Sequence, residues 1–361
     1  MPHHLPPLAI TMGEPAGVGG ELVFAAWSAL RASGLVFFVI DDPLRLDQLA
    51  ERIGQKIKFQ TISEPAEAAD VFQVALPVIP VGARVGSVPG QLDPAHAPAV
   101  VRAIEMAVAL AQSNAASGIV TNPIQKSTLY DAGFKYPGHT EFLGALAGGG
   151  RAPVMMLACP DLRVVPVTVH QSLRSAVAEL TTNAIVEKSL IAADALRLDF
   201  GVARPRLAIA GLNPHAGEGG AMGDEEARII RPAVDILHAK GLAVRGPLPP
   251  DTLFTPRARP TYDVAICMYH DQALIPLKAL DIDGGVNVTL GLDIVRTSPD
   301  HGTALDIAGT GAAHPGSLIA ALRMADDMAR RRGNALRTSG SRPKASNEGD
   351  HRDLLDRIAL D

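Results

Sequence analysis

Three histidines follow apolar, strand-like runs in this chain, each at the point where its run ends. They are His170 after residues 164–169, His215 after residues 207–212 and the pair Asn213-Pro214, and His270 after residues 264–269. In a parallel α/β sheet the carboxyl ends of the strands form one edge, and ligands bind in the crevice there. Three imidazoles at that edge can hold a divalent metal ion and leave its other positions open for a substrate. The alternative is three separate histidines, each hydrogen-bonded to its own surroundings.

Two aspartates stand near these histidines or near the same predicted edge. Asp271 directly follows His270, and Asp251 follows the rigid run Pro247-Leu248-Pro249-Pro250. A carboxylate beside a ligand histidine orients the imidazole or acts as a base, so Asp271 and Asp251 are the candidate catalytic residues. Either could equally be a helix cap or a solvated charge.

Residues suited to an anionic substrate form two groups. Lys278, Asn287 and Arg296 are evenly spaced between two glycine-rich loops, and such side chains together can bind a phosphate and a carboxylate. His139 and Thr140 follow a Pro-Gly turn and begin an apolar helix, whose first N–H groups can hold a phosphate. The alternatives are surface charges in the first group and an ordinary helix cap at Thr140.

Two loops rich in glycine are candidates for cofactor binding. Residues 11–20 join a strand to a helix, but their glycine spacing is neither the dinucleotide fingerprint nor a P-loop. They are either a tight turn next to a site or a plain strand–helix corner. Residues 301–311 resemble the cofactor loop of the β-decarboxylating dehydrogenases, although Thr303-Ala304-Leu305-Asp306 stands where those enzymes carry Ser-Ala-Pro-Asp. This resemblance implies that His301, Gly302, Thr303 and Asp306 bind the cofactor.

Short apolar runs alternate with helical patterns along the chain, which predicts a mostly parallel sheet covered by helices. The expected strands are 8–11, 35–40 and 119–120, and the expected helices are 20–33, 95–112 and 181–198, the last capped by Thr181 and Thr182. We expect a first α/β domain of residues 1–130 plus 300–332 and a second, carrying the histidines, of residues 131–299. Residues 333–361 have the composition of a flexible polar tail, within which 354–360 form a short amphipathic stretch.

The overall composition narrows the class of protein. A net charge of −5 gives no reason to expect a nucleic-acid partner, and Arg330-Arg331-Arg332 has the place of cations at a helix end. Cys159 and Cys267 lie in apolar stretches, which favours buried free thiols over a disulfide. The amino terminus lacks a signal-peptide pattern, and no apolar run reaches membrane-spanning length. We therefore expect a soluble, cytoplasmic enzyme with no membrane partner.

Several segments, taken together, resemble the 4-hydroxythreonine-4-phosphate dehydrogenase family of pyridoxal phosphate biosynthesis. The segments are 12–19 (MGEPAGVG), 138–141 (GHTE), 213–218 (NPHAGE), 269–272 (YHDQ), 284–292 and 298–311, and the resemblance covers residues 8–330. It implies a two-domain α/β/α fold like that of the isocitrate and isopropylmalate dehydrogenases, with the site in the cleft between the domains. It also implies a homodimer with the site at the subunit interface.

The same resemblance implies roles for the candidate residues. His170, His215 and His270 would hold one divalent ion (zinc, cobalt or magnesium), and His139, Thr140, Lys278, Asn287 and Arg296 would contact the phosphorylated substrate. The cofactor would be NAD or NADP. No clear basic residue for a 2′-phosphate lies near residues 301–311, which favours NAD.

The implied reaction oxidises the 3-hydroxyl of 4-hydroxythreonine 4-phosphate to 2-amino-3-oxo-4-phosphooxybutanoate. That product loses carbon dioxide to give 3-amino-2-oxopropyl phosphate, on the way to pyridoxine 5′-phosphate. A dehydrogenase of threonate or erythronate 4-phosphate in carbon catabolism is the nearest alternative. A phosphate acyltransferase and a non-catalytic phosphometabolite-binding protein are more distant ones, since neither needs the metal-type histidines together with a cofactor loop.

Overall fold

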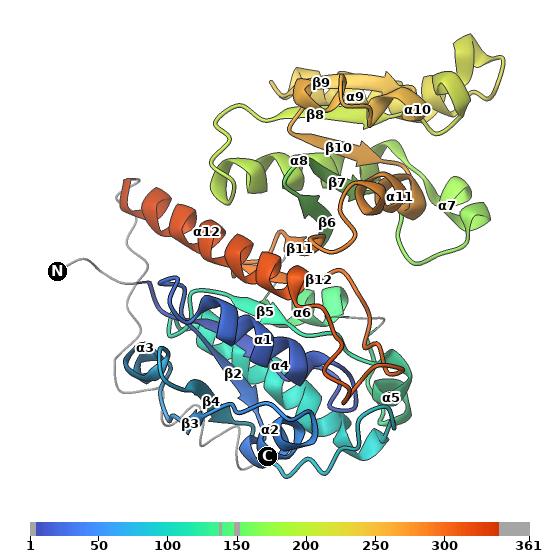
Figure 1. The fold of residues 1–361 in the computed structure, drawn as a ribbon. Coiled ribbons are helices and arrows are strands. Elements are labelled where there is room, and N and C mark those ends of the chain that lie inside the picture. The colour runs from blue at the N-terminus through green and yellow to red at the C-terminus, as the bar shows by residue number, and fades with distance from the viewer. Residues whose placement is uncertain (1–4, 137–138, 148–151, 339–361) are drawn as a thin grey trace. The chain divides into compact units, whose positions relative to one another are not determined.

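The computed structural model describes residues 5–136, 139–147 and 152–338, without the side chains of residues 139, 140 and 335–338. The chain divides into two compact units. Unit 1 consists of Met1–Arg151 and Leu292–Asp361, and unit 2 of Ala152–Gly291. Figure 1 shows the elements of both units along the chain. Each unit contains a sheet with helices packed against it, which confirms the predicted α/β class.

Unit 1 contains a parallel sheet in the order β3-β4-β2-β1-β5-β12. Its strands are β1 (Leu8–Thr11), β2 (Phe37–Asp41), β3 (Phe59–Thr61), β4 (Leu76–Pro80), β5 (Ile119–Thr121) and β12 (Arg296–Pro299). Its helices are α1 (Gly19–Leu30), α2 (Pro43–Arg52), α3 (Ala68–Val71), α4 (Ala97–Gln112), α5 (Lys126–Asp131), α6 (His139–Ala147) and α12 (Gly316–Thr338). The carboxyl ends of β1, β5 and β12 are neighbours at one edge because these strands pair in parallel.

The central strands β1 and β2 of unit 1 are buried on both faces, as expected of a parallel sheet between helices. On β1, Ala9 packs into a core cluster with residues of α4 such as Val100 and Ile104, while Leu8 and Ile10 are equally buried but alternate to the opposite face. α1 and α12 contact each other, and α12 also lies against β12 and β5 (Figure 1). The sheet of unit 1 therefore lies between α4 on one face and α1 and α12 on the other.

Unit 2 contains a mixed sheet in the order β11-β6-β7-β10-β8-β9. Its strands are β6 (Val154–Cys159), β7 (Leu162–Pro166), β8 (Arg206–Ala210), β9 (Ala243–Leu248), β10 (Val264–Cys267) and β11 (Val286–Leu290). Its helices are α7 (Leu173–Glu179), α8 (Thr182–Leu198), α9 (Arg231–Ala239), α10 (Pro250–Leu253) and α11 (His270–Leu280). β7, β10, β8 and β9 run parallel, whereas β6 is antiparallel to both β7 and β11. α11 packs on β7 and β10, and its Ala273 and Leu277 enter the core with Val164 and Ala265.

Most elements expected from the sequence are present, but two boundaries differ. The division between the units places residues 131–151 and 292–299 in unit 1, whereas the sequence analysis assigned them to the second domain. The last helix was expected to end near Arg332, which was wrong, because α12 continues to Thr338. The remainder of the predicted polar tail, including the stretch at 354–360, lies outside the described residues.

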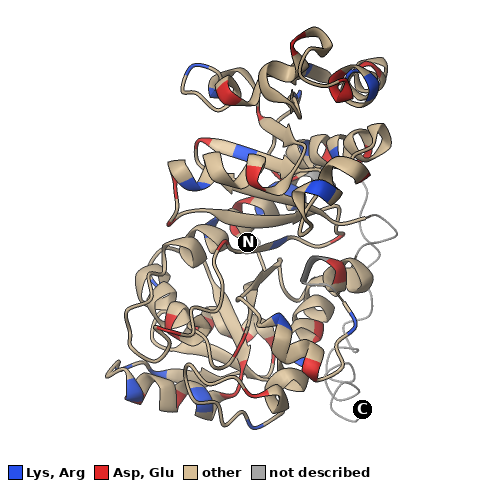
Figure 2. Cartoon of the chain, turned by 90° about the vertical axis from the view of Figure 1, so that its right-hand side faces the viewer, with Lys and Arg blue, Asp and Glu red and all other residues tan. Residues whose placement is uncertain are grey.

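Basic and acidic residues are interspersed over the helices and loops of each unit (Figure 2). Cys159 and Cys267 are both buried and free, as the sequence predicted. Within the described ranges, none of the helices combines the length and the apolar character needed to cross a membrane.

Candidate active site

The three histidines singled out in the sequence follow three neighbouring parallel strands of unit 2. β10 pairs with β7 on one side, with Cys267 opposite Pro166, and with β8 on the other, with Ile266 opposite Ile209. His170, His270 and His215 each come within a few residues of the end of β7, β10 and β8 respectively. The predicted placement of these residues beyond strand ends is therefore confirmed. Their role as metal ligands stays a prediction.

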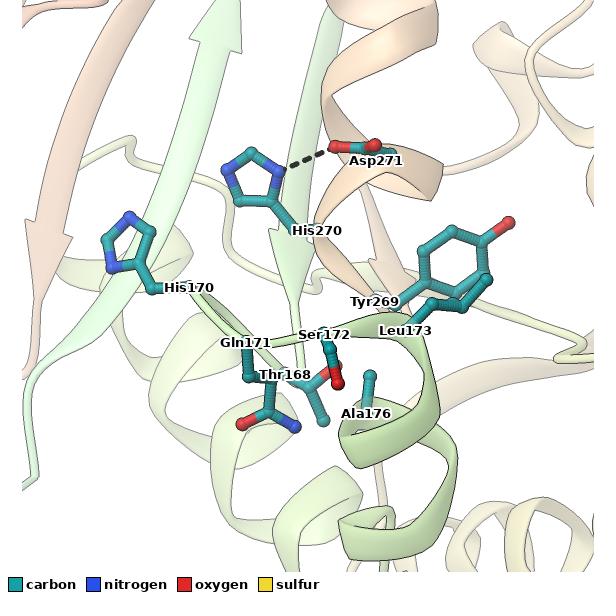
Figure 3. A pocket seen from close by; sticks show the side chains of 9 residues that line it. All are labelled: Thr168, His170, Gln171, Ser172, Leu173, Ala176, Tyr269, His270 and Asp271. Atoms are coloured by element: carbon teal, nitrogen blue, oxygen red, sulfur yellow. Dashed lines mark hydrogen bonds and ion pairs between the residues drawn. The ribbon is translucent and has the colours of Figure 1, made fainter.

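His170 and His270 lie side by side at the rim of a pocket (Figure 3). Their ring centroids are 5.9 Å apart. The pocket has a volume of about 390 Å³ and is lined by Thr168, His170, Gln171, Ser172, Leu173, Ala176, Tyr269, His270 and Asp271. The backbone N–H groups of Val167 and Thr168 donate to the carbonyls of Cys267 and Met268, so the two loops continue side by side past their strands. That pairing is what brings the two imidazoles together.

Asp271 is hydrogen-bonded to its neighbour, His270. The His270 Nδ1 atom lies 2.8 Å from Asp271 Oδ1, shown by the dashed line in Figure 3. A carboxylate on Nδ1 favours the tautomer in which Nε2 carries the free lone pair, which is the form that binds a metal. Of the two functions open to Asp271 in the sequence, orienting the imidazole is the one that this contact supports.

His215 makes a similar contact but does not line that pocket. It is exposed, and its Nδ1 atom lies 3.1 Å from Glu218 Oε2. The hydrogen bond to Glu218 raises the pKa of His215, and the charge of nearby Asp251, in the first turn of α10, adds a smaller effect in the same direction. Across the described part of the chain, no group of three or more His, Cys, Asp or Glu side chains is gathered closely enough to hold a metal ion. One chain thus brings two of the three histidines together.

Gln272 is a structural element of this edge that the sequence analysis quoted but gave no role. Its side chain is buried; Oε1 accepts from the Met268 N–H at 2.6 Å, and Nε2 donates to the Gly211 carbonyl at 2.7 Å. It therefore ties the loop after β10 to the loop after β8. A glutamine directly after a histidine–aspartate pair was the available signal, but only the sheet order shows what it joins.

The predicted substrate residues of unit 2 are separated within it. Lys278 is exposed in the last turn of α11, and Asn287 lies on β11 opposite Leu157 of β6, hence inside the sheet rather than on a loop after a strand. The Asn287 Oδ1 atom is buried and accepts no hydrogen bond from a described residue.

Arg296, by contrast, belongs to unit 1, where it is the first residue of β12. It is buried, and its Nε and Nη2 atoms donate to Thr121 Oγ1 at 3.2 and 2.7 Å, at the end of β5. Burial lowers the pKa of Arg296 to about 10. His139 and Thr140 open α6, as the sequence predicted for a helix start, but their side chains lie outside the described atoms.

The predicted cofactor loop packs against the glycine-rich loop of unit 1. The Thr303 carbonyl accepts from the Val18 N–H at 3.1 Å, and Thr303 Oγ1 donates to Gln125 Oε1 at 3.2 Å. A Cβ atom on Gly17 would lie 2.8 Å from that Thr303 carbonyl, which explains the glycine. His301 and Asp306 are exposed on the same loop. Residues 11–20 are therefore a tight turn beside the predicted cofactor loop.

Two buried glutamates of this region were missed by the sequence analysis. Glu21 of α1 accepts from the Gly309 and Gly311 N–H groups, the latter at 2.7 Å, so it holds the far end of the cofactor loop. Glu14 accepts from the Ala16 N–H at 3.1 Å, and burial raises its pKa above the ordinary value. Glu21 could not be recognised from spacing, because its partners lie almost three hundred residues away in the sequence.

A sequence model of the family described as "Pyridoxal phosphate biosynthetic protein PdxA" matches residues 35–325. The chain is 56% identical to the 4-hydroxythreonine-4-phosphate dehydrogenase of Caulobacter vibrioides over 332 residues, which are 91% of this chain and 98% of that protein. It is 52% identical to the enzyme of the same name from Bradyrhizobium diazoefficiens, again over 91% of this chain and 98% of that protein. The chain belongs to the PdxA family.

Solved structures agree with the PdxA assignment. The 4-hydroxythreonine-4-phosphate dehydrogenase of Klebsiella pneumoniae has a TM-score of 0.80 at 39% identity, and covers 90% of this chain and 99% of its own. A branched-chain phosphotransacylase of Enterococcus faecalis shares the fold at a TM-score of 0.53, with only 12% identity over 90% of this chain and 99% of that one. The PdxA match includes every predicted site residue, from His139 to Asp306, but not the glycine-rich loop at 11–20.

Proposed function

We propose that this chain is a 4-hydroxythreonine-4-phosphate dehydrogenase of pyridoxal phosphate biosynthesis. The observation that carries the proposal is the close identity to relatives of that name along nearly their whole length. The site geometry supports it, because histidines at neighbouring strand ends suit a metal-assisted oxidation of an alcohol.

The donor set of unit 2 fits one divalent metal ion. His170 and His270 are adjacent, and the Nδ1 atoms of His270 and His215 each face a carboxylate, which leaves Nε2 of both rings for a ligand bond. We assign His170, His215 and His270 as the ligands. The ion would supply positive charge that stabilises the 3-alkoxide of the substrate and the enolate formed when carbon dioxide leaves. Zinc, cobalt and magnesium are all candidates for it.

His215 reaches this centre, in our proposal, from a second copy of the chain. It is exposed and does not line the pocket beside His170 and His270. A C2 dimer presents the same surface from both subunits, so His215 of each chain can complete the site of the other. The proposal therefore includes a homodimer with the site at the subunit interface.

The substrate's anionic ends require positive charge and N–H donors. We assign Arg296 and Lys278 as the cations, Asn287 as the amide, and His139 and Thr140 at the start of α6 as partners of the phosphate. Arg296 is held by Thr121 at the end of β5, which fixes its guanidinium at the sheet edge of unit 1. The buried Oδ1 of Asn287 is a polar atom whose desolvation a substrate donor would offset.

The reaction needs a base for the substrate's 3-hydroxyl and a site for the cofactor that accepts the hydride. Asp271 orients His270, which leaves Asp251, exposed and near His215, as the base that takes the proton of the 3-hydroxyl. His301, Gly302, Thr303 and Asp306 would bind the adenosine part of NAD or NADP, on a loop that Glu21 and Val18 hold against α1.

The test is formation of reduced cofactor by the purified wild-type protein from 4-hydroxythreonine 4-phosphate. Threonate and erythronate 4-phosphates serve as competing substrates, and NAD is compared with NADP. Turnover that is fastest with the amino acid, and that chelator abolishes and added metal restores, is the expected result. Preference for a sugar acid would move the enzyme to carbon catabolism, and no turnover with any of the three would refute the dehydrogenase assignment.

A further inference from the structure

The loop that carries His215 has an unusual backbone conformation. Six successive residues have positive φ angles: His215 (53°), Ala216 (54°), Gly217 (80°), Glu218 (42°), Gly219 (68°) and Gly220 (100°). Three of the six are not glycine, and residues with a Cβ atom rarely occupy this left-handed region. Such a run persists only where surrounding contacts hold it in place.

Glu226 supplies those contacts from outside the loop. It is buried, and it begins the π-helical turn Glu226–Ile230. Its Oε1 atom accepts from the backbone N–H groups of Leu212 and Asn213, both at 2.7 Å. Its Oε2 atom accepts from Asn213 Nδ2 at 2.9 Å. Both oxygens are therefore engaged by the segment that leads directly into the left-handed run.

The loop also closes tightly around this carboxylate. A Cβ atom on Gly217 would lie 2.7 Å from Glu226 Oε2, and one on Gly211 would lie 3.2 Å from Oε1. Both ends of the segment from Gly211 to Gly217 therefore leave no room for a side chain beside Glu226. The turn exposes His215 and brings Glu218 within hydrogen-bond reach of its Nδ1 atom.

We propose that Glu226 is a positioning residue for the reaction: it holds residues 211–219 in the one conformation that presents His215 for metal binding. Glu226 itself makes no contact with His215 in the structure's hydrogen-bond network, and it acts through the backbone of Leu212 and Asn213. This inference rests on the proposed function, because it needs His215 to be a ligand. The π-helical turn is consistent with it, since such turns often occur at functional sites.

The test compares Glu226→Gln with Glu225→Gln, a matched control one residue away. The only side chain that donates to Glu225 in the described residues is Asn213, whose Nδ2 atom lies 2.8 Å from Oε2, and a glutamine there can still accept this bond with its oxygen. A glutamine at 226 cannot, because donors face both of its terminal atoms and one of them becomes an NH2 group. The two variants make the same chemical change, but only E226Q leaves a buried mismatch.

Three quantities are measured: hydrogen exchange of peptides covering 211–220 in metal-free protein, the Kd for Co²⁺ by titration, and the melting temperature. We expect E226Q to lose about tenfold in amide protection of this loop and roughly 10- to 100-fold in Co²⁺ affinity. E225Q should stay within about twofold of wild type in both.

The outcomes separate positioning from mere stability. If E226Q lowers the melting temperature but leaves the Co²⁺ Kd of the folded protein unchanged, Glu226 is only structural and the inference is wrong. Unchanged loop protection would also overturn it. Wild-type turnover on 4-hydroxythreonine 4-phosphate tests the proposed function separately, and wild-type protein that turns over without binding Co²⁺ would remove His215 as a ligand and the inference with it.

Discussion

The substitution Asp271→Asn separates two roles for the aspartate beside His270. As an orienting group, Asp271 stabilises the imidazole tautomer that binds metal through a charge-assisted hydrogen bond of 2.8 Å. Asparagine can still accept this bond with its amide oxygen, but without the charge, so the bond weakens by about half. Loss of a carboxylate partner behind a ligand histidine costs 10- to 100-fold in metal affinity, about 1.4–2.8 kcal/mol.

Asp271 and His270 are both partly exposed, so we expect the loss of metal affinity to be at the lower end of that range. The side chain of Asp271 is 70% exposed and that of His270 34%, so water screens the interaction. We therefore expect D271N to raise the Kd for Co²⁺ by about tenfold and to retain most of its kcat at saturating metal. A general base behaves differently, because its removal lowers kcat by roughly 10²- to 10⁴-fold whatever the metal concentration.

The assay is a Co²⁺ titration of the apoprotein followed by initial rates at saturating metal, with Asp235→Asn on the exposed side of α9 as the control. The control should match wild type in both measurements. An unchanged Kd combined with a kcat more than a hundredfold lower would refute the orienting role and make Asp271 the base. Asp251→Asn, measured in parallel, should show that catalytic loss instead.

Three further predictions concern the other parts of the site. Glu21 accepts hydrogen bonds from the Gly309 and Gly311 N–H groups of the cofactor loop, so Glu21→Gln should raise the KM for NAD several-fold and leave the KM for substrate unchanged. Equal changes of the two KM values in steady-state kinetics would contradict this. Burial raises the pKa of Glu14 in the folded state, so the wild-type protein should lose stability as the pH rises from the ordinary pKa of a glutamate through this raised pKa. Glu14→Gln should remove this loss. The free energy of unfolding, measured by chemical denaturation at several pH values, would refute the prediction if it fell in parallel for both proteins. Mixing inactive H170A and H215A chains should restore about a quarter of wild-type activity if His215 serves the partner's site, since half the dimers are then mixed and one of their two sites is intact; a mixture that stays inactive after subunit exchange would place all three ligands in one chain.

Local patterns were enough to predict several elements of the fold. The strand at 8–11 was predicted with the bounds that β1 has, and the helix expected over 181–198 is α8 with Thr181 as its cap, where Oγ1 accepts from the Ala184 N–H. Apolar alternation and a capping hydroxyl act within a few residues, so the sequence shows them directly. The end of α12 was missed for the converse reason. The three arginines at 330–332 and the polar composition after them suggested an end, but Arg332 donates to the Asp293 carbonyl 39 residues away, a contact that local patterns do not show.

The site itself depends on contacts that no local pattern contains. That the histidines follow strand ends was predictable, because parallel strands end at a common edge. Which of them become neighbours depends on the sheet order β7-β10-β8, and on the pairing of Val167 and Thr168 with the loop after β10. The first domain boundary lies later than expected because α6 packs on α4 of unit 1, a contact between helices that are not consecutive in the sequence.

Two histidines of unit 2 face a carboxylate at Nδ1, yet the backbone produces the two pairs in different ways. Asp271 directly follows His270 at the start of α11, so this pair is formed by two residues adjacent in the sequence. Glu218 reaches His215 only because the chain between them is left-handed, and that conformation depends on Glu226, which lies outside the turn. A substitution in the α11 turn should therefore affect one imidazole, whereas a change at Glu226 displaces a whole segment. The side-chain geometry of His270 therefore depends on its neighbour in the sequence, whereas that of His215 depends on a contact with Glu226. Sequence spacing could place both histidines beyond strand ends, but it could explain the carboxylate partner of His270 only.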